Sequence, residues 1–181
     1  MLIQKYNKIC LGIDASGNTG KQLGTTGFAR IDIDPLDPGL AYIKAKENES
    51  EKSYFTRILH YLDLLYNECL KDNIPFIITV EKYIDYGNGA TKFTTPPTIK
   101  LNSEIESWCH NKVKVIFRQK AASHLKSRWN NDVLIAEGYG NLEEFKKRNT
   151  KPNKDMIDAL RACLDGYYFG ESKELNNECS N

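Results

Sequence analysis

The chain has 181 residues, of which 40% are hydrophobic and 27% are charged, a composition typical of one globular domain that buries its own core. No apolar run approaches the roughly 20 residues that span a bilayer, and residues 1–8 contain no apolar signal region, so we expect a cytoplasmic protein without a membrane partner. The formal net charge of +1 is too small to indicate a nucleic-acid partner by itself. The cysteines show no zinc-ligand spacing and are expected to be reduced thiols.

The spacing of apolar residues predicts an alternation of strands and helices. In chain order, we expect strands at 8–14, 25–33 and 40–45, a helix at 49–70, a strand at 76–81, a loop at 83–94, a helix from 96 or 97 to 110, a strand at 113–117, and helices at 121–127 and 155–169. Residues 129–153 are expected to combine a loop with a helix near 141–148, and residues 171–181 to form a polar, disordered tail. Three strands in a meander followed by alternating helices and strands predict a single α/β domain over residues 1–170, with a five-stranded mixed sheet flanked by helices.

Four acidic residues fall where α/β proteins gather their ligand sites. Asp14 ends the first predicted strand and Glu81 ends the fourth, so both project from one edge of the sheet if these strands are neighbours. Asp155 and Asp158 share one face of the last helix, near its start. A single acid at such a place can equally form a turn or complement the helix dipole, so the prediction depends on their joint placement. Asp165 lies on the same helix, and the residues alone leave open which acid accompanies Asp155.

Carboxylates that converge repel one another, and taking them partly out of water costs several kcal/mol unless a cation or a proton intervenes. Hard oxygen ligands suit Mg²⁺ or Mn²⁺. Two such ions about 4 Å apart can activate a water molecule and stabilise the leaving oxygen of a phosphodiester. The acids therefore predict a two-metal site for phosphodiester hydrolysis.

Two basic clusters indicate where phosphates could be neutralised in spite of the small net charge. The first lies in a stretch without acids between residues 107 and 131, and the second precedes the last helix. Their members are Lys112, Lys114, Arg118, Lys120, Lys126 and Arg128 in the first, and Lys146, Lys147, Arg148, Lys151 and Lys154 in the second. Either cluster can equally be a solvated face without a ligand.

Three segments resemble motifs of the RuvC-type Holliday junction resolvases, which belong to the RNase H-like superfamily. They are residues 11–17 (Leu-Gly-Ile-Asp-Ala-Ser-Gly) with Thr-Gly at 26–27, residues 78–81 (Ile-Thr-Val-Glu), and residues 155–160 (Asp-Met-Ile-Asp-Ala-Leu). Residues 117–126 are more loosely similar to the basic segment that follows the fifth strand in that family. The resemblance extends over residues 8–169, although residues 18–24 lengthen the first turn.

The resemblance implies an RNase H-like fold and a homodimeric, metal-dependent endodeoxyribonuclease that nicks two strands of a four-way DNA junction. It implies that Asp14, Glu81, Asp155 and Asp158 hold two Mg²⁺ or Mn²⁺ ions and that Lys126 contacts the phosphate near the scissile bond. The residues that we expect to contact DNA are Tyr83, Tyr86, Lys100, Arg118, Lys120, Lys126, Arg128, Lys151 and Lys154. The small size and the content of lysine, asparagine and isoleucine resemble a phage or low-GC bacterial version of the family.

One departure concerns the aromatic residue that family members often carry three positions after the second acid. That position holds Ile84, with Tyr83 and Tyr86 beside it. Stacking of either tyrosine on a base is therefore a hypothesis, and both can equally be ordinary loop aromatics.

Three other functions stay open. A branch or flap nuclease could use the same fold and the same acids. An actin-like or sugar-kinase ATPase also opens on a strand, an acid and a glycine-rich turn, but Ala15 and Gln22 replace the glycine and the hydroxyl residue of a phosphate loop, so we expect no nucleotide cofactor. A catalytically silent junction-binding protein would not need the full set of acids.

Overall fold

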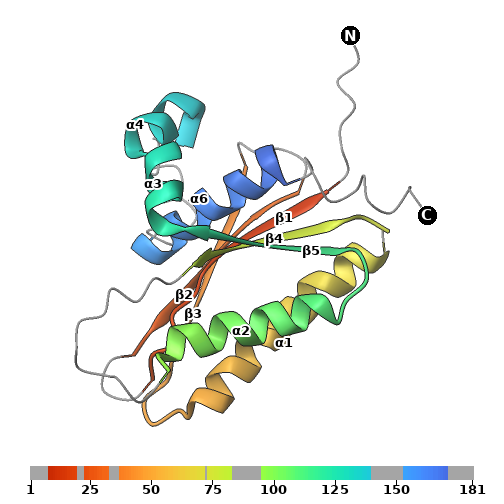
Figure 1. Ribbon diagram of the computed structural model, residues 1–181, viewed down its shortest axis with the longest axis vertical. Coiled ribbons are helices and arrows are strands. Elements are labelled where there is room, and N and C mark those ends of the chain that lie inside the picture. The colour runs from red at the N-terminus through yellow and green to blue at the C-terminus, as the bar shows by residue number, and fades with distance from the viewer. Residues whose placement is uncertain are drawn as a thin grey trace.

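The protein is described by a computed structural model that covers residues 8–19, 23–32, 37–71, 73–82, 95–139 and 153–170. Its elements are β1 (Ile9–Asp14), β2 (Thr25–Ile31), β3 (Gly39–Lys44), α1 (Glu51–Lys71), β4 (Phe76–Lys82), α2 (Pro97–His110), β5 (Val115–Ala121), α3 (Ala122–Arg128), α4 (Asn131–Leu134), η1 (Ile135–Tyr139) and α6 (Lys154–Phe169). They form a five-stranded mixed sheet in the order β3-β2-β1-β4-β5 (Figure 1). Helices α1 and α2 cover one face, and α6 covers the other with α3 beside it, so the predicted fold class is confirmed.

β1 lies at the centre of the sheet and pairs with a strand of each direction. It is antiparallel to β2 and parallel to β4, and β4 is in turn parallel to β5. Ile13 of β1 pairs with Val80 of β4. Asp14 and Glu81 follow one residue later on the two strands, and the carboxyl ends of these strands therefore meet at one edge of the sheet.

The alternation of side chains along β1 and β4 determines the face of the sheet to which each acidic side chain points. Ile13 and Val80 belong to the hydrophobic core beneath α1 and α2, whereas Cys10 belongs to the core beneath α6. Successive side chains of a strand point to opposite faces of the sheet. Asp14 and Glu81 consequently both lie on the face that α6 covers.

Two glycines allow α6 to lie directly on the sheet. A Cβ atom at Gly12 would be 1.9 Å from the carbonyl oxygen of Ala159, and one at Gly27 would be 2.3 Å from the carbonyl oxygen of Asp155. The backbone of α6 therefore occupies the space that a side chain would need. Because Gly27 pairs with Asp14 across the sheet, this contact brings the first turn of α6 to the end of β1.

The structure differs from the prediction at both ends of β5 and over residues 131–139. β5 begins at Val115 rather than at 113, because Lys114 has a left-handed backbone, with φ of 59°, that a strand cannot include. It also extends past 117 to Ala121, which pairs with Lys82. Residues 131–139, which we expected to be part of a loop, form α4 and η1, and the side chain of Asn130 accepts a hydrogen bond from the backbone N–H of Val133 at the start of α4.

Other predictions concern residues outside the described ranges, namely the loop at 83–94, the helix near 141–148 and the tail at 171–181. Within the described ranges, no helix is both long enough and apolar enough to cross a membrane. Cys69, Cys109 and Cys163 are buried thiols.

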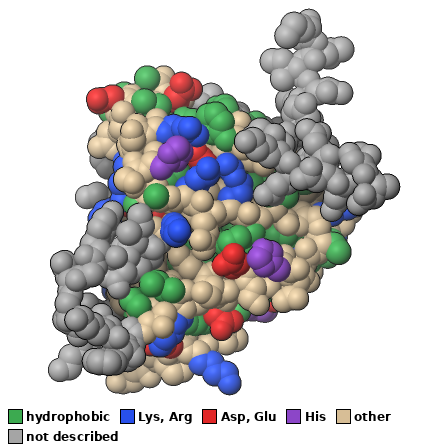
Figure 2. Space-filling view, in the orientation of Figure 1, with side chains coloured by type: hydrophobic (Ala, Val, Ile, Leu, Met, Phe, Trp, Pro, Cys, Tyr) green, Lys and Arg blue, Asp and Glu red, His purple; other side chains and the backbone are tan. Residues whose placement is uncertain are grey.

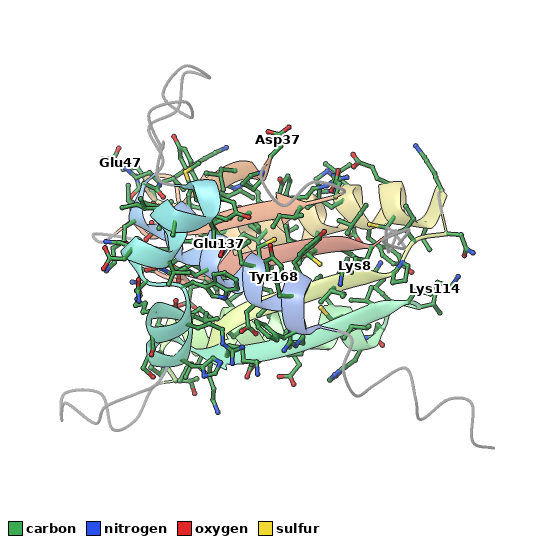
Figure 3. All side chains as sticks on the ribbon, turned by 90° about the horizontal axis from the view of Figure 1, so that it is seen from above. Lys8, Asp37, Glu47, Lys114, Glu137 and Tyr168 are labelled. Carbon is green, nitrogen blue, oxygen red and sulfur yellow. The ribbon has the colours of Figure 1, made fainter. Side chains whose placement is uncertain are left out.

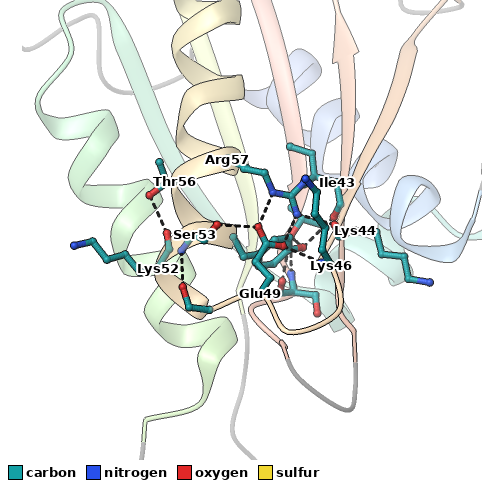
Figure 4. A network of polar contacts seen from close by, with 12 residues as sticks. Ile43, Lys44, Lys46, Glu49, Lys52, Ser53, Thr56 and Arg57 are labelled. Carbon is teal, nitrogen blue, oxygen red and sulfur yellow. Dashed lines mark hydrogen bonds and ion pairs between the residues drawn. The ribbon is translucent and has the colours of Figure 1, made fainter.

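A polar network joins the end of β3 to the start of α1 (Figure 4). Arg57 Nη2 lies 2.6 Å from Glu49 Oε2, and Arg57 also donates to the carbonyl oxygen of Lys44. The backbone N–H of Lys46 and the hydroxyl of Ser53 donate to the same glutamate. The hydrogen bond from Arg57 lowers the pKa of Glu49 to about 2, so Glu49 is ionised across the neutral range.

Candidate functional site

Three of the four predicted acids, Asp14, Glu81 and Asp155, have a raised pKa near the carboxyl ends of β1 and β4. Burial raises the pKa of Asp14 to about 8, and the negative charges of Glu81, Asp158 and Asp155 add to this shift. The positive charge of Lys126 lowers the pKa of Asp14 and partly offsets this increase. A carboxyl group with three other acids close enough to raise its pKa shows that these distant segments converge.

Glu81 and Asp155 have the same kind of environment. Burial raises the pKa of Glu81, Lys126 opposes this shift, and the charge of Asp158 adds to it. Burial and the charge of Asp158 also raise the pKa of Asp155, while Lys154 lowers it. The Oε2 atom of Glu81 is buried and has no hydrogen-bond partner in the part of the chain that the structure describes, which is unfavourable for a carboxylate oxygen unless a ligand or a proton satisfies it.

Asp158 is the most buried member of the set and has two cationic partners. Its Oδ2 atom lies 3.2 Å from Lys126 Nζ, and its Oδ1 atom accepts a hydrogen bond from Arg161 Nη1. Lys126 Nζ also lies 3.9 Å from Glu81 Oε1. The ammonium group therefore lies between two of the predicted metal ligands.

Arg161 fixes Asp158 relative to the segment that follows α3. Its Nε atom donates to the carbonyl oxygen of Trp129 at 2.9 Å, and its Nη2 atom donates to the side chain of Asn131 at 2.8 Å. The ring centre of Trp129 lies 5.5 Å from that of Tyr168 on α6. Arg161 is not among the residues predicted from the sequence, although its position three residues after Asp158 on a predicted helix is a spacing at which ion pairs form.

Asp165 is separate from the acid set and instead anchors α3. Its side chain is fully buried, with Oδ1 3.0 Å from Arg128 Nη1 and Oδ2 3.4 Å from Arg118 Nη2. Arg118 Nη1 also donates to the backbone carbonyl of Asp165 at 3.0 Å, and His124 Nε2 lies 3.9 Å from the carboxylate. These contacts join β5, α3 and α6. Asp155 and Asp158, rather than Asp165, are therefore the helical acids that approach Asp14.

The donor set fits a hard divalent cation by its chemistry. It offers carboxylates whose charges repel one another and a buried oxygen of Glu81 that lacks a partner. Among the residues that the structure describes, however, no three acidic, histidine or cysteine side chains are grouped closely enough to hold a metal ion. The two oxygens of Asp158 are instead contacted by the side-chain cations of Lys126 and Arg161.

The predicted DNA contacts are distributed around this edge. Lys120 pairs with Glu81 in the sheet register, and Lys154 opens α6. Lys100 lies on α2 and forms an ion pair of 3.0 Å with Glu51. Figure 2 shows lysine and arginine side chains gathered around a histidine on the face that carries α3 and β5.

Two of the predicted DNA contacts, Arg118 and Arg128, are already engaged with Asp165, and the side chain of Arg118 is only 14% exposed. Tyr83, Tyr86 and Lys151 lie outside the described residues. The roles of all these residues toward DNA stay predictions.

Neither models of protein families nor curated proteins match the sequence. Among solved structures, the chain is similar to RuvC of Thermus thermophilus in complex with Holliday junction substrate, with a TM-score of 0.59, 12% identity, and coverage of 90% of this chain and 94% of that one. It is also similar to a second Thermus thermophilus RuvC structure, with a TM-score of 0.54, 13% identity, and coverage of 90% and 95%. At these identities the likeness concerns the fold. The chain therefore has an RNase H-like fold whose architecture matches that of RuvC.

Proposed function

We propose that the protein is a metal-dependent DNA endonuclease that resolves four-way junctions by paired nicking. The observation that carries the proposal is the meeting of β1, β4 and the first turn of α6 at one edge of the sheet, where the charges of Glu81, Asp155 and Asp158 raise the pKa of Asp14. The likeness of fold to a RuvC that is bound to a Holliday junction substrate supports the choice of substrate.

The side chains would have different roles in such a site. Asp14, Glu81, Asp155 and Asp158 would hold the cations. Two Mg²⁺ or Mn²⁺ ions, when bound, supply activation of a water molecule and stabilisation of the leaving oxygen. Glu81 contributes an oxygen that has no hydrogen-bond partner among the described residues, and Arg161 keeps Asp158 in place.

The DNA would approach along the same edge. Lys126 is 41% exposed and lies beside the acids, so its ammonium group can contact a phosphate near the scissile bond. Lys120 and Lys154 flank the acids on β5 and α6. Paired nicking needs two such centres, and we infer a homodimer that places one on each of two strands.

The first test compares three DNA substrates in the presence and absence of Mg²⁺: a synthetic four-way junction, a flap and a plain duplex. We expect symmetric nicks in the junction that depend on the metal. Preferred cutting of the flap would instead indicate a branch or flap nuclease on this fold. Binding of the junction without any cleavage would indicate a silent junction-binding protein, and turnover of ATP would indicate the kinase-like alternative.

Replacement of one acid tests the site itself. Asp14→Asn should lower the cleavage rate by about 10³-fold or more, because the interactions that a metal site supplies are worth several kcal/mol in the transition state. Junction binding, measured in Ca²⁺, should be largely retained. Asp132→Asn is the matched control, since Asp132 is exposed on α4, and it should cleave normally. An Asp14→Asn variant that still cuts at the wild-type rate in Mg²⁺ would refute the assignment.

A further inference from the structure

A lysine lies among the acids that the proposed function assigns to divalent cations. Lys126 Nζ is 3.2 Å from Asp158 Oδ2 and 3.9 Å from Glu81 Oε1. We propose that Lys126 is a built-in counter-ion that competes with the divalent cation for Glu81 and Asp158 and must move away before these acids can bind it. This inference rests on the proposed function and concerns the regulation of the same centre.

The electrostatic surroundings support this role. The ammonium group of Lys126 is within ion-pair distance of Glu81 and Asp158, and its positive charge attracts both carboxylates. A cation bound to the same carboxylates would do the same. Because like charges repel at short range, binding of a divalent ion beside Asp158 is less favourable in free energy while the ammonium group of Lys126 is also there.

Lys126, rather than Arg161, is the cation that can leave. The side chain of Arg161 is 11% exposed and also binds the carbonyl oxygen of Trp129 and the side chain of Asn131. The side chain of Lys126 is 41% exposed, and among the described residues its ion-pair partners are Glu81 and Asp158. A lysine is a strongly hydrated point charge on a flexible stem, so it can exchange carboxylate for water readily.

The helix that carries Lys126 is itself held in place. Arg128 of α3 binds the buried carboxylate of Asp165 at 3.0 Å, and its guanidinium carbon lies 4.2 Å from the centre of the Phe169 ring. The movement is therefore one of the side chain and not of α3. Once released, the ammonium group stays near the acids and becomes available to a DNA phosphate, which links loading of the centre to engagement of the substrate.

The test measures Mn²⁺ binding by the full chain without DNA, from the loss of the electron paramagnetic resonance signal of free Mn²⁺. Lys126→Met removes the charge and keeps the length of the side chain, and we expect its Kd for Mn²⁺ to fall about tenfold. Lys126→Arg keeps the charge and should bind close to the wild-type level. Glu81→Gln should weaken binding, which locates the ion at this centre.

Lys112→Met is the matched control, because Lys112 forms an ion pair of 2.9 Å with Asp63, an acid outside this set. Its Kd should stay at the wild-type value, so that a general effect of net charge is excluded. Thermal unfolding without metal checks that each variant is folded, and Lys126→Gln offers a second side chain without charge.

The outcomes are distinct. Unchanged or weaker Mn²⁺ binding by Lys126→Met and Lys126→Gln would overturn the competition and make Lys126 a positioning residue for the acids. Absence of Mn²⁺ binding in every variant would also overturn it. Tighter binding by these variants, together with a wild-type protein that cuts none of the DNA substrates, would uphold the competition while removing the proposed function.

Discussion

Asp158 is held by two cations that differ in how firmly they are fixed. Arg161 has three partners and little contact with solvent, whereas Lys126 is partly exposed. A buried ion pair of this kind adds little net stability compared with apolar residues, but removal of one partner leaves a charge without compensation. The arginine therefore matters to both the stability and the geometry of the site.

At the residue scale, we predict that Arg161→Met lowers the free energy of unfolding by about 2–3 kcal/mol, because the buried carboxylate of Asp158 loses its charged hydrogen bond. Urea unfolding followed by circular dichroism measures the change. Arg161→Lys should recover only part of the loss, since a lysine cannot bind Asp158, Trp129 and Asn131 at once. An unfolding free energy equal to that of the wild type in Arg161→Met would contradict this role.

The sequence singles out Asp14, Glu81 and Asp155 as candidate ligands, because each falls at the end of a strand or in the first turn of a helix. It could not decide between Asp158 and Asp165. The two residues are seven apart and share one face of α6, so only the tertiary packing separates them. Asp158 reaches the end of the strands, while Asp165 lies two turns further on, against Arg118 and Arg128. The contact of Lys126 with Asp158 is equally tertiary, and no local spacing indicates it.

At the element scale, the position of α6 depends on the absence of side chains beneath it. Gly12 is the critical contact, because a Cβ atom there would be 1.9 Å from a backbone oxygen that belongs to a helix and cannot give way by itself. We predict that Gly12→Ala lowers the free energy of unfolding by about 3 kcal/mol or more.

Gly39→Ala is the control for this prediction, since the nearest atom to its Cβ would be the carbonyl oxygen of Arg30 at 3.9 Å. That variant should change the unfolding free energy by less than about 0.5 kcal/mol. Equal stabilities of the two variants in urea would show that α6 does not rest on the sheet in this way.

The connection from β3 to α1 supplies a prediction about pH. The pKa of Glu49 is about 2 in the folded chain against an ordinary value of 4.5, so its ion pair with Arg57 stabilises the protein fully above pH 4.5 and is lost as the pH falls toward 2. Glu49→Gln should therefore lower the free energy of unfolding by about 1–2 kcal/mol at pH 7 and change it very little near pH 2. Glu47→Gln, which alters an exposed neighbour (Figure 3), should have little effect at either pH. A loss from Glu49→Gln that is equal at both pH values would argue against the ion pair.

Helices and strands differ in how well the sequence predicts them. The long helices and the buried strands have a clear apolar period, and their type is confirmed. The start of β5 was misplaced because the left-handed conformation of Lys114 is not a preference of lysine but a result of its turn. α4 is too short to show a helical period, and the cap by Asn130 was its only local signal.

At the scale of the whole molecule, the candidate site lies on the side of the sheet that carries the core beneath α6. The larger core lies beneath α1 and α2 and contains no member of the acid set. Fold class could be predicted because a meander followed by alternating helices and strands leaves few topologies. The sheet order and the site's internal ion pairs could not, since they depend on contacts between segments far apart along the chain.

Side chains alternate between the two faces of the sheet along β1 and β4, and this alternation limits which insertions and deletions the protein can accept during evolution. Removal of a single residue within either strand would turn the terminal acid toward the opposite core, where α1 and α2 leave it no water and no partner. Insertions or deletions inside these strands are therefore tolerated only when they involve an even number of residues. The turn between β1 and β2 is not subject to this constraint, so residues can be added there while Asp14 keeps its place at the end of β1.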